Sequence, residues 1–301
     1  MTAPKRILFM AEAATLAHVI RPLELAKTAA ALGYEVHFAC AENDLTRQRA
    51  FLFHDVPFSR WNIRSQPSAR FLKAADTGAR LFDFPTLLDY AADDLRLFEQ
   101  VRPDLVVGDF RWSLAASAPA YGVPHAALQN AYWSPNAAPL ARFPLPEYLP
   151  LRLLARLLGE HLTAALSGPT RPLAMGYHLR PINRLRRRYG LPPFGGLFEA
   201  LTHGDYTLYA DLPDLVPIDP LPERQRYLGP MAWAPPSPLP EWWADLPADR
   251  PLVYVSLGSS GRGEVLPALL AALANLPLTA MLATAGVAAD GAWPANVYTA
   301  K

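Results

Sequence analysis

The sequence predicts an α/β protein of two domains, each built on a parallel sheet that is flanked by helices. Three observations support this class. A length of 301 residues is typical of about two domains. Short apolar strands alternate with longer helical patterns along the chain. The strand-then-turn pattern near the N-terminus is found again after Pro251.

The first predicted domain begins with an apolar strand over 6–10 and an amphipathic helix over 19–32. Gly33 follows this helix, and glycine commonly ends helices because it adopts the left-handed conformation without strain. A second strand over 35–40 completes a strand–helix–strand unit. The same alternation continues with a helix over 84–101, a strand over 105–108, a helix over 114–121, and strands over 124–128 and 207–210.

Proline divides the rest of the chain. Between about 130 and 205 prolines interrupt the helical pattern, which is typical of an insertion that lines a cleft or of a loop-rich cover. The segment 229–250 is richer still in proline and is predicted to be a stiff linker. We therefore expect a first domain over 1–228, with a helical insertion over about 130–205, and a partial second domain over 251–301.

Composition excludes several classes of function. The net charge of +1 argues against a nucleic-acid partner, which needs a concentrated basic surface. The basic run over 184–188 is predicted to be the solvated face of a helix. Cys40, the single cysteine, excludes a disulfide within the chain, so we expect a reducing, cytoplasmic location. The uncharged stretch over 265–289 is divided by Pro267, Asn275 and Pro277, so no transmembrane segment is predicted.

Two polar residues follow predicted strands of the first domain. His18 comes after the first strand, and Asp109 ends the strand of the segment 103–109. Sites in open α/β folds collect at the carboxyl ends of strands, where a histidine can act as a base and a carboxylate can orient it. The alternatives are a histidine without a role and an aspartate that caps the following helix. Capping and orienting are compatible.

The turn after the strand over 252–256 is rich in glycine and serine. It consists of Gly258, Ser259, Ser260 and Gly261, and a predicted helix follows it. Glycine lets the backbone approach a phosphate closely, serine adds hydroxyl donors, and the helix N-terminus adds free N–H groups. The turn is therefore a candidate phosphate site. An ordinary tight turn is the alternative.

Three segments together resemble one family. They are Ala17–Pro22 with the following Leu32–Val36, then Asp104–Asp109, and then Val253–Ser259. In this order they resemble the GT-B glycosyltransferases of the family that includes the UDP-glucuronosyltransferases and the bacterial macrolide and rhamnosyl transferases. The resemblance covers almost the whole chain. It implies two Rossmann-like domains facing a cleft, with the acceptor on the first domain and a nucleotide-sugar donor on the second.

The resemblance also implies the chemistry. His18 would take the proton of an acceptor hydroxyl as that oxygen attacks the anomeric carbon of a hexose, which inverts the configuration. Asp109 would hold the other ring nitrogen and stabilise the imidazolium as it forms. A base that titrates near neutral pH suits this task because an alcohol is a very weak acid. The mechanism needs no metal and no cofactor beyond the donor, and no metal-ligand spacing stands out in the sequence.

The same resemblance assigns the two substrates. The turn at 258–261 would contact the nucleotide diphosphate. The acceptor would be a small molecule or a lipid, in contact with aromatic residues on the rim of the cleft: Trp112, Tyr132 and Trp133. A tryptophan in a half-apolar loop is also typical of a core.

The chain departs from the family pattern in two ways. Ala17 stands where the family often has glycine before the histidine. The later donor motif is absent, which indicates a fragment, or a chain completed by a complementing C-terminal fragment, with little activity by itself. A non-catalytic binding or partner subunit is therefore an alternative function. A sugar-nucleotide epimerase is a further one, although Asp290 is the only acidic candidate near the C-terminal end.

Overall fold

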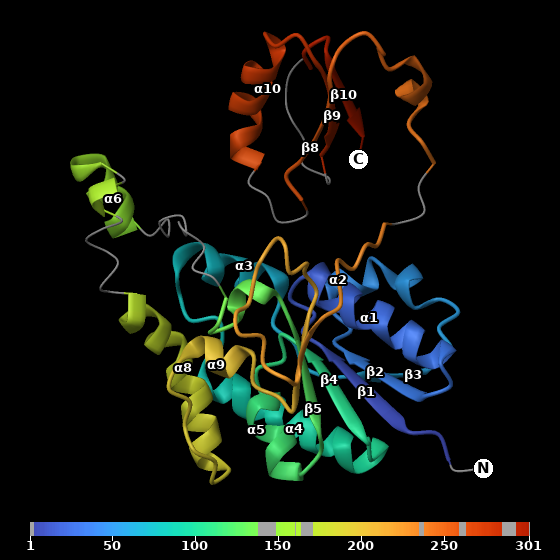
Figure 1. The fold of residues 1–301 in the computed structure, drawn as a ribbon, viewed down its shortest axis with the longest axis vertical. Helices are drawn as coiled ribbons and strands as arrows, with labels where there is room; N and C mark the ends of the chain where they lie inside the picture. Colours follow the sequence, from blue (N-terminus) through green and yellow to red (C-terminus); the bar gives the residue numbers. More distant parts are fainter. Residues whose placement is uncertain are drawn as a thin grey trace. The chain divides into compact units, whose positions relative to one another are not determined.

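The protein divides into two compact units (Figure 1), Met1–Trp233 and Ala234–Lys301. The computed structural model describes residues 3–137, 149–159, 161–163, 171–234, 238–258, 263–284 and 293–300. The division falls inside the predicted linker 229–250. Met231 and Trp233 pack against the core of the first unit. Trp242 belongs to the second unit, where its Nε1 donates to the carbonyl oxygen of Thr299 at 2.8 Å.

The first unit contains a seven-stranded parallel sheet. Its strands lie in the spatial order β3 (Ser59–Asn62), β2 (Glu35–Cys40), β1 (Arg6–Ala11), β4 (Leu105–Asp109), β5 (His125–Gln129), β6 (Tyr206–Tyr209) and β7 (Gln225–Tyr227). The order reverses between β1 and β4, where Ala11 pairs with Asp109. Ligands of doubly wound sheets bind at the carboxyl ends of the strands at such a reversal.

Helices of the first unit cover both faces of this sheet. The helices of this unit are α1 (Leu16–Ala31), α2 (Asp44–Arg47), α3 (Ser68–Thr77), α4 (Phe84–Val101), α5 (Leu114–Tyr121), α6 (Leu149–Leu158), α8 (Arg171–Arg188) and α9 (Leu197–Leu201), with short 3-10 helices over Ala50–Phe53 and Ala131–Trp133. Leu23 of α1 packs with Phe9 in one core, whereas Phe98 of α4 packs with Leu8 in another. Successive strand residues point to opposite faces, so Leu8 and Phe9 reach different layers.

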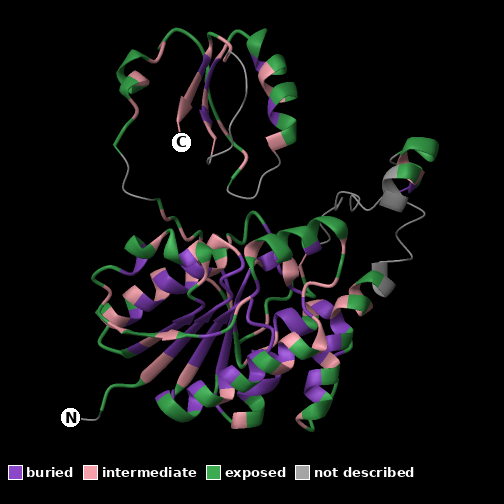
Figure 2. Cartoon of the chain, turned by 180° about the vertical axis from the view of Figure 1, so that it is seen from behind, coloured by how far each residue is buried: buried purple, intermediate pink, exposed green. Residues whose placement is uncertain are grey.

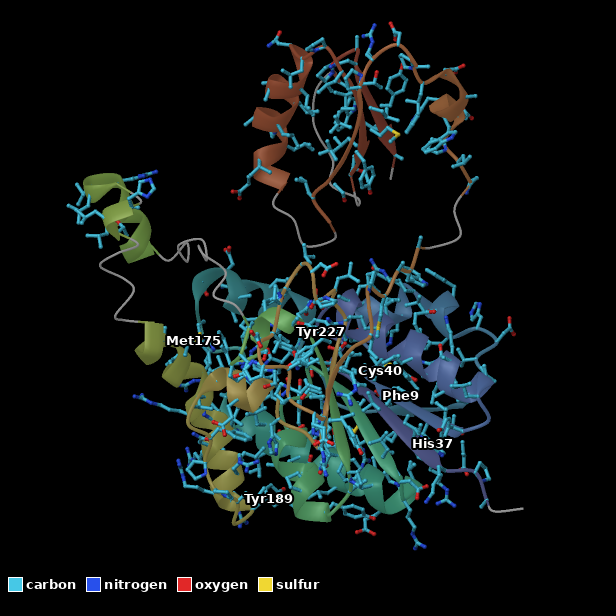
Figure 3. The ribbon with its side chains drawn as sticks, in the orientation of Figure 1. Phe9, His37, Cys40, Met175, Tyr189 and Tyr227 are labelled. Carbon is cyan, nitrogen blue, oxygen red and sulfur yellow. The ribbon has the colours of Figure 1, made fainter. Side chains whose placement is uncertain are left out.

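Burial follows from this layering. Every residue of β5 is buried, and Figure 2 shows the central strands buried along most of their length. Phe9 and Cys40 (Figure 3) lie in the same core. Cys40 is buried, and burial raises the pKa of its thiol to about 11.

The alternation of strands and helices expected in the first unit is confirmed, and α4 has the predicted bounds. Strands β3 and β7 are not among the elements that the sequence predicted. They lie at the two edges of the sheet, where a strand needs less apolar surface, and polar residues make up most of both. The prediction for the basic run was wrong at Arg186. This residue is buried, with its Nε donating to the carbonyl oxygen of Pro192 at 2.7 Å.

The second unit is smaller. Its parallel strands lie in the order β10 (Val297–Ala300), β9 (Thr279–Ala283) and β8 (Leu252–Ser256), with α10 (Leu266–Ala274) and 3-10 helices over Glu241–Asp245 and Gly263–Val265. Strand β8 has the bounds that the sequence predicted. Leu266 and Leu273 of α10 pack on Ala280 and Leu282 of β9. At the edge of the sheet, Tyr254 of β8 is 66% exposed.

Among the helices that the structure describes, none combines the length and the apolar character that crossing a membrane requires.

Candidate active site

The reversal point of the first sheet brings His18 and Asp109 together. His18 lies in the first turn of α1, directly after the loop that follows β1, and Asp109 is the last residue of β4. Although the two residues are 91 positions apart, His18 Nδ1 lies 2.8 Å from Asp109 Oδ1. The Asp109 side chain is fully buried and that of His18 is 15% exposed. Ala17 lies within α1, and its φ is not in the left-handed region.

The contact with Asp109 defines the tautomer of His18. A carboxylate oxygen only accepts hydrogen bonds, so a nitrogen at 2.8 Å from it must carry the proton. A neutral imidazole with its proton on Nδ1 has its lone pair on Nε2. The ring also stacks on Phe110, with ring centroids 4.4 Å apart and an interplanar angle of 17°. Phe110 has a φ of 56°, a left-handed conformation that a bulky residue rarely adopts, and its ring contacts His18.

Arg21 is a site residue to which the sequence analysis gave no role. Its Nε donates to Asp109 Oδ2 at 2.8 Å, and its Nη2 donates to Asp109 Oδ1 at 2.7 Å. The third guanidinium nitrogen, Nη1, donates to Asn130 Oδ1 at 2.9 Å. The signal was present in the sequence, because residues three apart on a helix share a face, and Arg21 follows His18 by three.

A buried charged cluster lies next to this pair. Glu12 follows β1 and accepts hydrogen bonds from Ser65 Oγ and from the backbone N–H of Gln66. Arg111 lies 2.9 Å from Asp94 and 3.8 Å from Glu12, and all three side chains are fully buried. Burial raises the pKa of Glu12, although Arg111 and the hydrogen bonds to Ser65 and Gln66 act in the opposite direction. Burial therefore favours the neutral acid at Glu12.

A pocket of about 340 Å³ within the first unit opens beside His18. Its lining is mostly apolar and aromatic, and includes Phe71, Phe110, Tyr132 and Trp133. Two of the predicted acceptor residues, Tyr132 and Trp133, thus lie in one pocket with His18. His178 of α8 also lines the pocket, and burial, followed by the charge of Arg80, lowers its pKa.

Trp112, the third predicted acceptor residue, lies elsewhere. It is buried in the core, where its ring centroid is 4.9 Å from that of Phe82, and it does not line the pocket beside His18. The structure therefore gives this side chain a packing role. Phe110, two residues earlier, stacks on His18 and lines that pocket.

The predicted donor turn is described only at its start. Gly258 has a φ of 67°, the left-handed region that favours glycine, and its N–H donates to Ser256 Oγ at 3.1 Å. Ser259, Ser260 and Gly261 lie outside the described residues. Within the described ranges, no group of three or more His, Cys, Asp or Glu residues could hold a metal ion.

Comparisons with known proteins connect this geometry to a family. No family model matches the chain. It is 44% identical over 297 residues to a PGL/p-HBAD biosynthesis rhamnosyltransferase of Mycobacterium bovis. These aligned residues make up 98% of this chain and 64% of that protein. It is also 44% identical to a PGL/p-HBAD biosynthesis glycosyltransferase of Mycobacterium tuberculosis, over 98% of this chain and 67% of that protein. The chain belongs to the family of PGL/p-HBAD biosynthesis glycosyltransferases.

The family also contains a protein with a different description. The chain is 44% identical over 270 residues to an inactive PGL/p-HBAD biosynthesis glycosyltransferase of Mycobacterium bovis, covering 89% of this chain and 71% of that one. The chain spans 64% of the length of the family's rhamnosyltransferase.

Solved structures confirm the fold expected from the sequence. The spinosyn forosaminyltransferase SpnP matches with a TM-score of 0.61 and 20% identity, over 99% of this chain and 70% of that chain. The spinosyn rhamnosyltransferase SpnG matches with a TM-score of 0.57 and 16% identity, over 99% and 70%. The chain therefore has the GT-B fold with Rossmann-like sheets, and it spans about 70% of the length of these two neighbours.

Proposed function

We propose that this chain carries the acceptor half of an inverting glycosyltransferase that uses a nucleotide sugar as its donor. The contact of 2.8 Å between His18 Nδ1 and Asp109 Oδ1, beside an apolar pocket, carries the proposal. In the reaction, Nε2 takes the proton of an acceptor hydroxyl while that oxygen bonds to the anomeric carbon. The bond from this carbon to the diphosphate breaks on the opposite face, and the nucleoside diphosphate leaves. Asp109 stabilises the imidazolium.

The pocket supports an acceptor with a flat apolar part. Phe71 and Phe110 supply aromatic surface, and Tyr132 and Trp133 add rings with a polar edge. A small phenolic molecule or a lipid with such a group fits these walls. Because a family relative is named a rhamnosyltransferase, we propose rhamnose, a 6-deoxyhexose, as the sugar. We further propose that the turn at 258–261 binds the donor diphosphate, without a metal ion.

Transfer is testable in a chimaera that spans the whole length of a relative. The chain would be joined to the C-terminal part of the Mycobacterium bovis relative and assayed by mass spectrometry with a nucleoside diphosphate rhamnose and a phenol. We expect His18→Ala to lower turnover by about 10²- to 10⁴-fold, the usual contribution of a general base. Asp109→Asn should lower it by more than about tenfold. His54→Ala, at an exposed position, is the matched control. Unchanged turnover in His18→Ala rejects the assignment.

A second candidate function is a non-catalytic binding or partner subunit. The relative described as inactive favours this candidate. Calorimetry on the 301-residue chain with a phenol and with the nucleotide sugar separates the two. Acceptor binding without turnover, even after a complementing C-terminal fragment is added, supports the binding subunit. Turnover restored by that fragment supports the transferase.

A further inference from the structure

Asp109 is a buried carboxylate that is already paired with a cation. Arg21 contacts both of its oxygens in the two-pronged geometry that is the strongest arrangement for a guanidinium and a carboxylate. The side chains of Arg21 and Asp109 are 11% and 0% exposed, so water screens this pair little. The negative charge next to His18 is therefore compensated before any proton moves.

The other charged groups near His18 leave this balance unchanged. On the adjacent loops, Arg111 is paired with Asp94, and burial favours the neutral form of Glu12. Across the pocket, burial lowers the pKa of His178, which favours a neutral imidazole. Tyr132 also stays neutral, because burial raises the pKa of its phenol. Arg21 with Asp109 and Arg111 with Asp94 are thus two pairs of opposite charge next to His18.

We infer that Arg21 is a positioning residue that keeps His18 a neutral imidazole with its proton on Nδ1. This inference rests on the proposed function of His18 as the base. A buried carboxylate without a cation would draw a second proton onto the neighbouring imidazole. The resulting imidazolium carries a proton on Nε2, so it could not accept one from the acceptor. Arg21 already compensates the negative charge of Asp109, so no second proton on His18 is required for that. The Nη2 atom of Arg21 lies 3.1 Å from His18 Nδ1, and its positive charge repels an imidazolium.

The same guanidinium connects the base with the pocket wall. Arg21 Nη1 donates to Asn130 Oδ1 at 2.9 Å, and Asn130 lines the pocket beside His18. One side chain therefore holds Asp109 and Asn130 in a fixed arrangement. This explains why a bidentate Arg, rather than a Lys, suits this position, since an ammonium is a point charge without the planar fork.

The test is nitrogen NMR of the 301-residue chain labelled with ¹⁵N-histidine, with the His18 signals assigned through His18→Gln. At pH 7.5 we expect wild-type His18 to be neutral and protonated at Nδ1. Arg21→Gln should convert most of the His18 signal to imidazolium. Arg21→Gln combined with Asp109→Asn should return it to the neutral form, because both charges are then absent. Arg21→Lys should stay neutral, because the positive charge remains.

The double variant distinguishes charge compensation from a structural role. A merely structural Arg21 would leave the single and double variants equally perturbed, and this outcome overturns the inference. A neutral His18 in folded Arg21→Gln also overturns it. If Arg21→Gln does not fold, the wild type and Arg21→Lys still decide, since an imidazolium in either at pH 7.5 contradicts the inference. Because NMR needs no substrate, absence of transferase activity would count against the proposed function alone.

Discussion

Strands β5 and β8 are both parallel strands of five residues, yet they have opposite environments. Every residue of β5 is buried between helices of the first unit. In β8, Leu252 is 49% exposed and Tyr254 is 66% exposed. A parallel strand is stable when layers cover both faces of its sheet. The comparison teaches that a strand pattern alone does not tell whether the second covering layer is present.

The two units also treat charge differently. In the first, Arg111 and Asp94 are fully buried and paired, whereas in the second the pair of Arg250 and Asp249 is exposed. Buried pairs cost much to break because the remaining charge has no water around it. The candidate site therefore lies in the unit whose packing holds charged side chains in defined positions.

The largest effect on stability is expected at Arg111. Arg111→Met leaves Asp94 buried without its cation, so we expect the free energy of unfolding to fall by about 3–5 kcal/mol. The matched control Arg250→Met removes an exposed pair and should change it by less than about 1 kcal/mol. Urea unfolding followed by tryptophan fluorescence measures both. Equal losses in the two variants would contradict the contrast between the units.

Truncations in the two strand environments should differ as well. Leu128 in β5 is fully buried, so Leu128→Ala should cost about 2–5 kcal/mol through lost burial and a cavity. Val253 in β8 is 36% exposed, and Val253→Ala should cost less than about 1 kcal/mol. The same urea experiment measures the difference. A cost at Val253 equal to that at Leu128 would mean that another layer covers β8 in solution.

A smaller effect depends on pH. Burial, followed by the charge of His203, lowers the pKa of His125 to about 3. Below about pH 6.5 the unfolded chain binds a proton that the folded chain refuses, so stability falls as the pH decreases. In His125→Leu this loss should be absent. As the pH decreases below about 6.5, the free energy of unfolding of the variant should therefore fall less steeply than that of the wild type, by up to about 1.4 kcal/mol per pH unit. Unfolding at pH 5, 6.5 and 8 measures it, with pH 8 as the reference. Parallel pH curves for the two proteins would contradict this account.

The smallest effect on stability is expected on the exposed edge of β8. Tyr254→Lys places a charge on an edge strand, which opposes pairing with another chain. We expect less self-association in light scattering, with the free energy of unfolding changed by less than about 0.5 kcal/mol. Tyr34→Lys, at an exposed position of the first unit, is the control and should leave self-association unchanged. If both variants scatter light as the wild type does, β8 is not the associating edge.

Much of the first unit could be predicted from the sequence. The period of apolar residues predicted α4 and the central strands, because this signal is local. His18 and Asp109 were recognisable because each follows a strand, and the ends of neighbouring parallel strands meet. The edge strands β3 and β7 were not recognisable, because their mostly polar residues carry little of that signal.

The tertiary structure alone decided which side chains complete the site. Phe110 and Trp112 are both aromatic and close in sequence, yet only Phe110 stacks on His18, from a left-handed backbone that residue type does not predict. Arg21 shares a helix face with His18, but only the packing of α1 against β4 places it on Asp109. Local periodicity determines which elements form. Which side chains of different elements contact one another depends on how those elements pack, and local patterns in a single sequence do not show this packing.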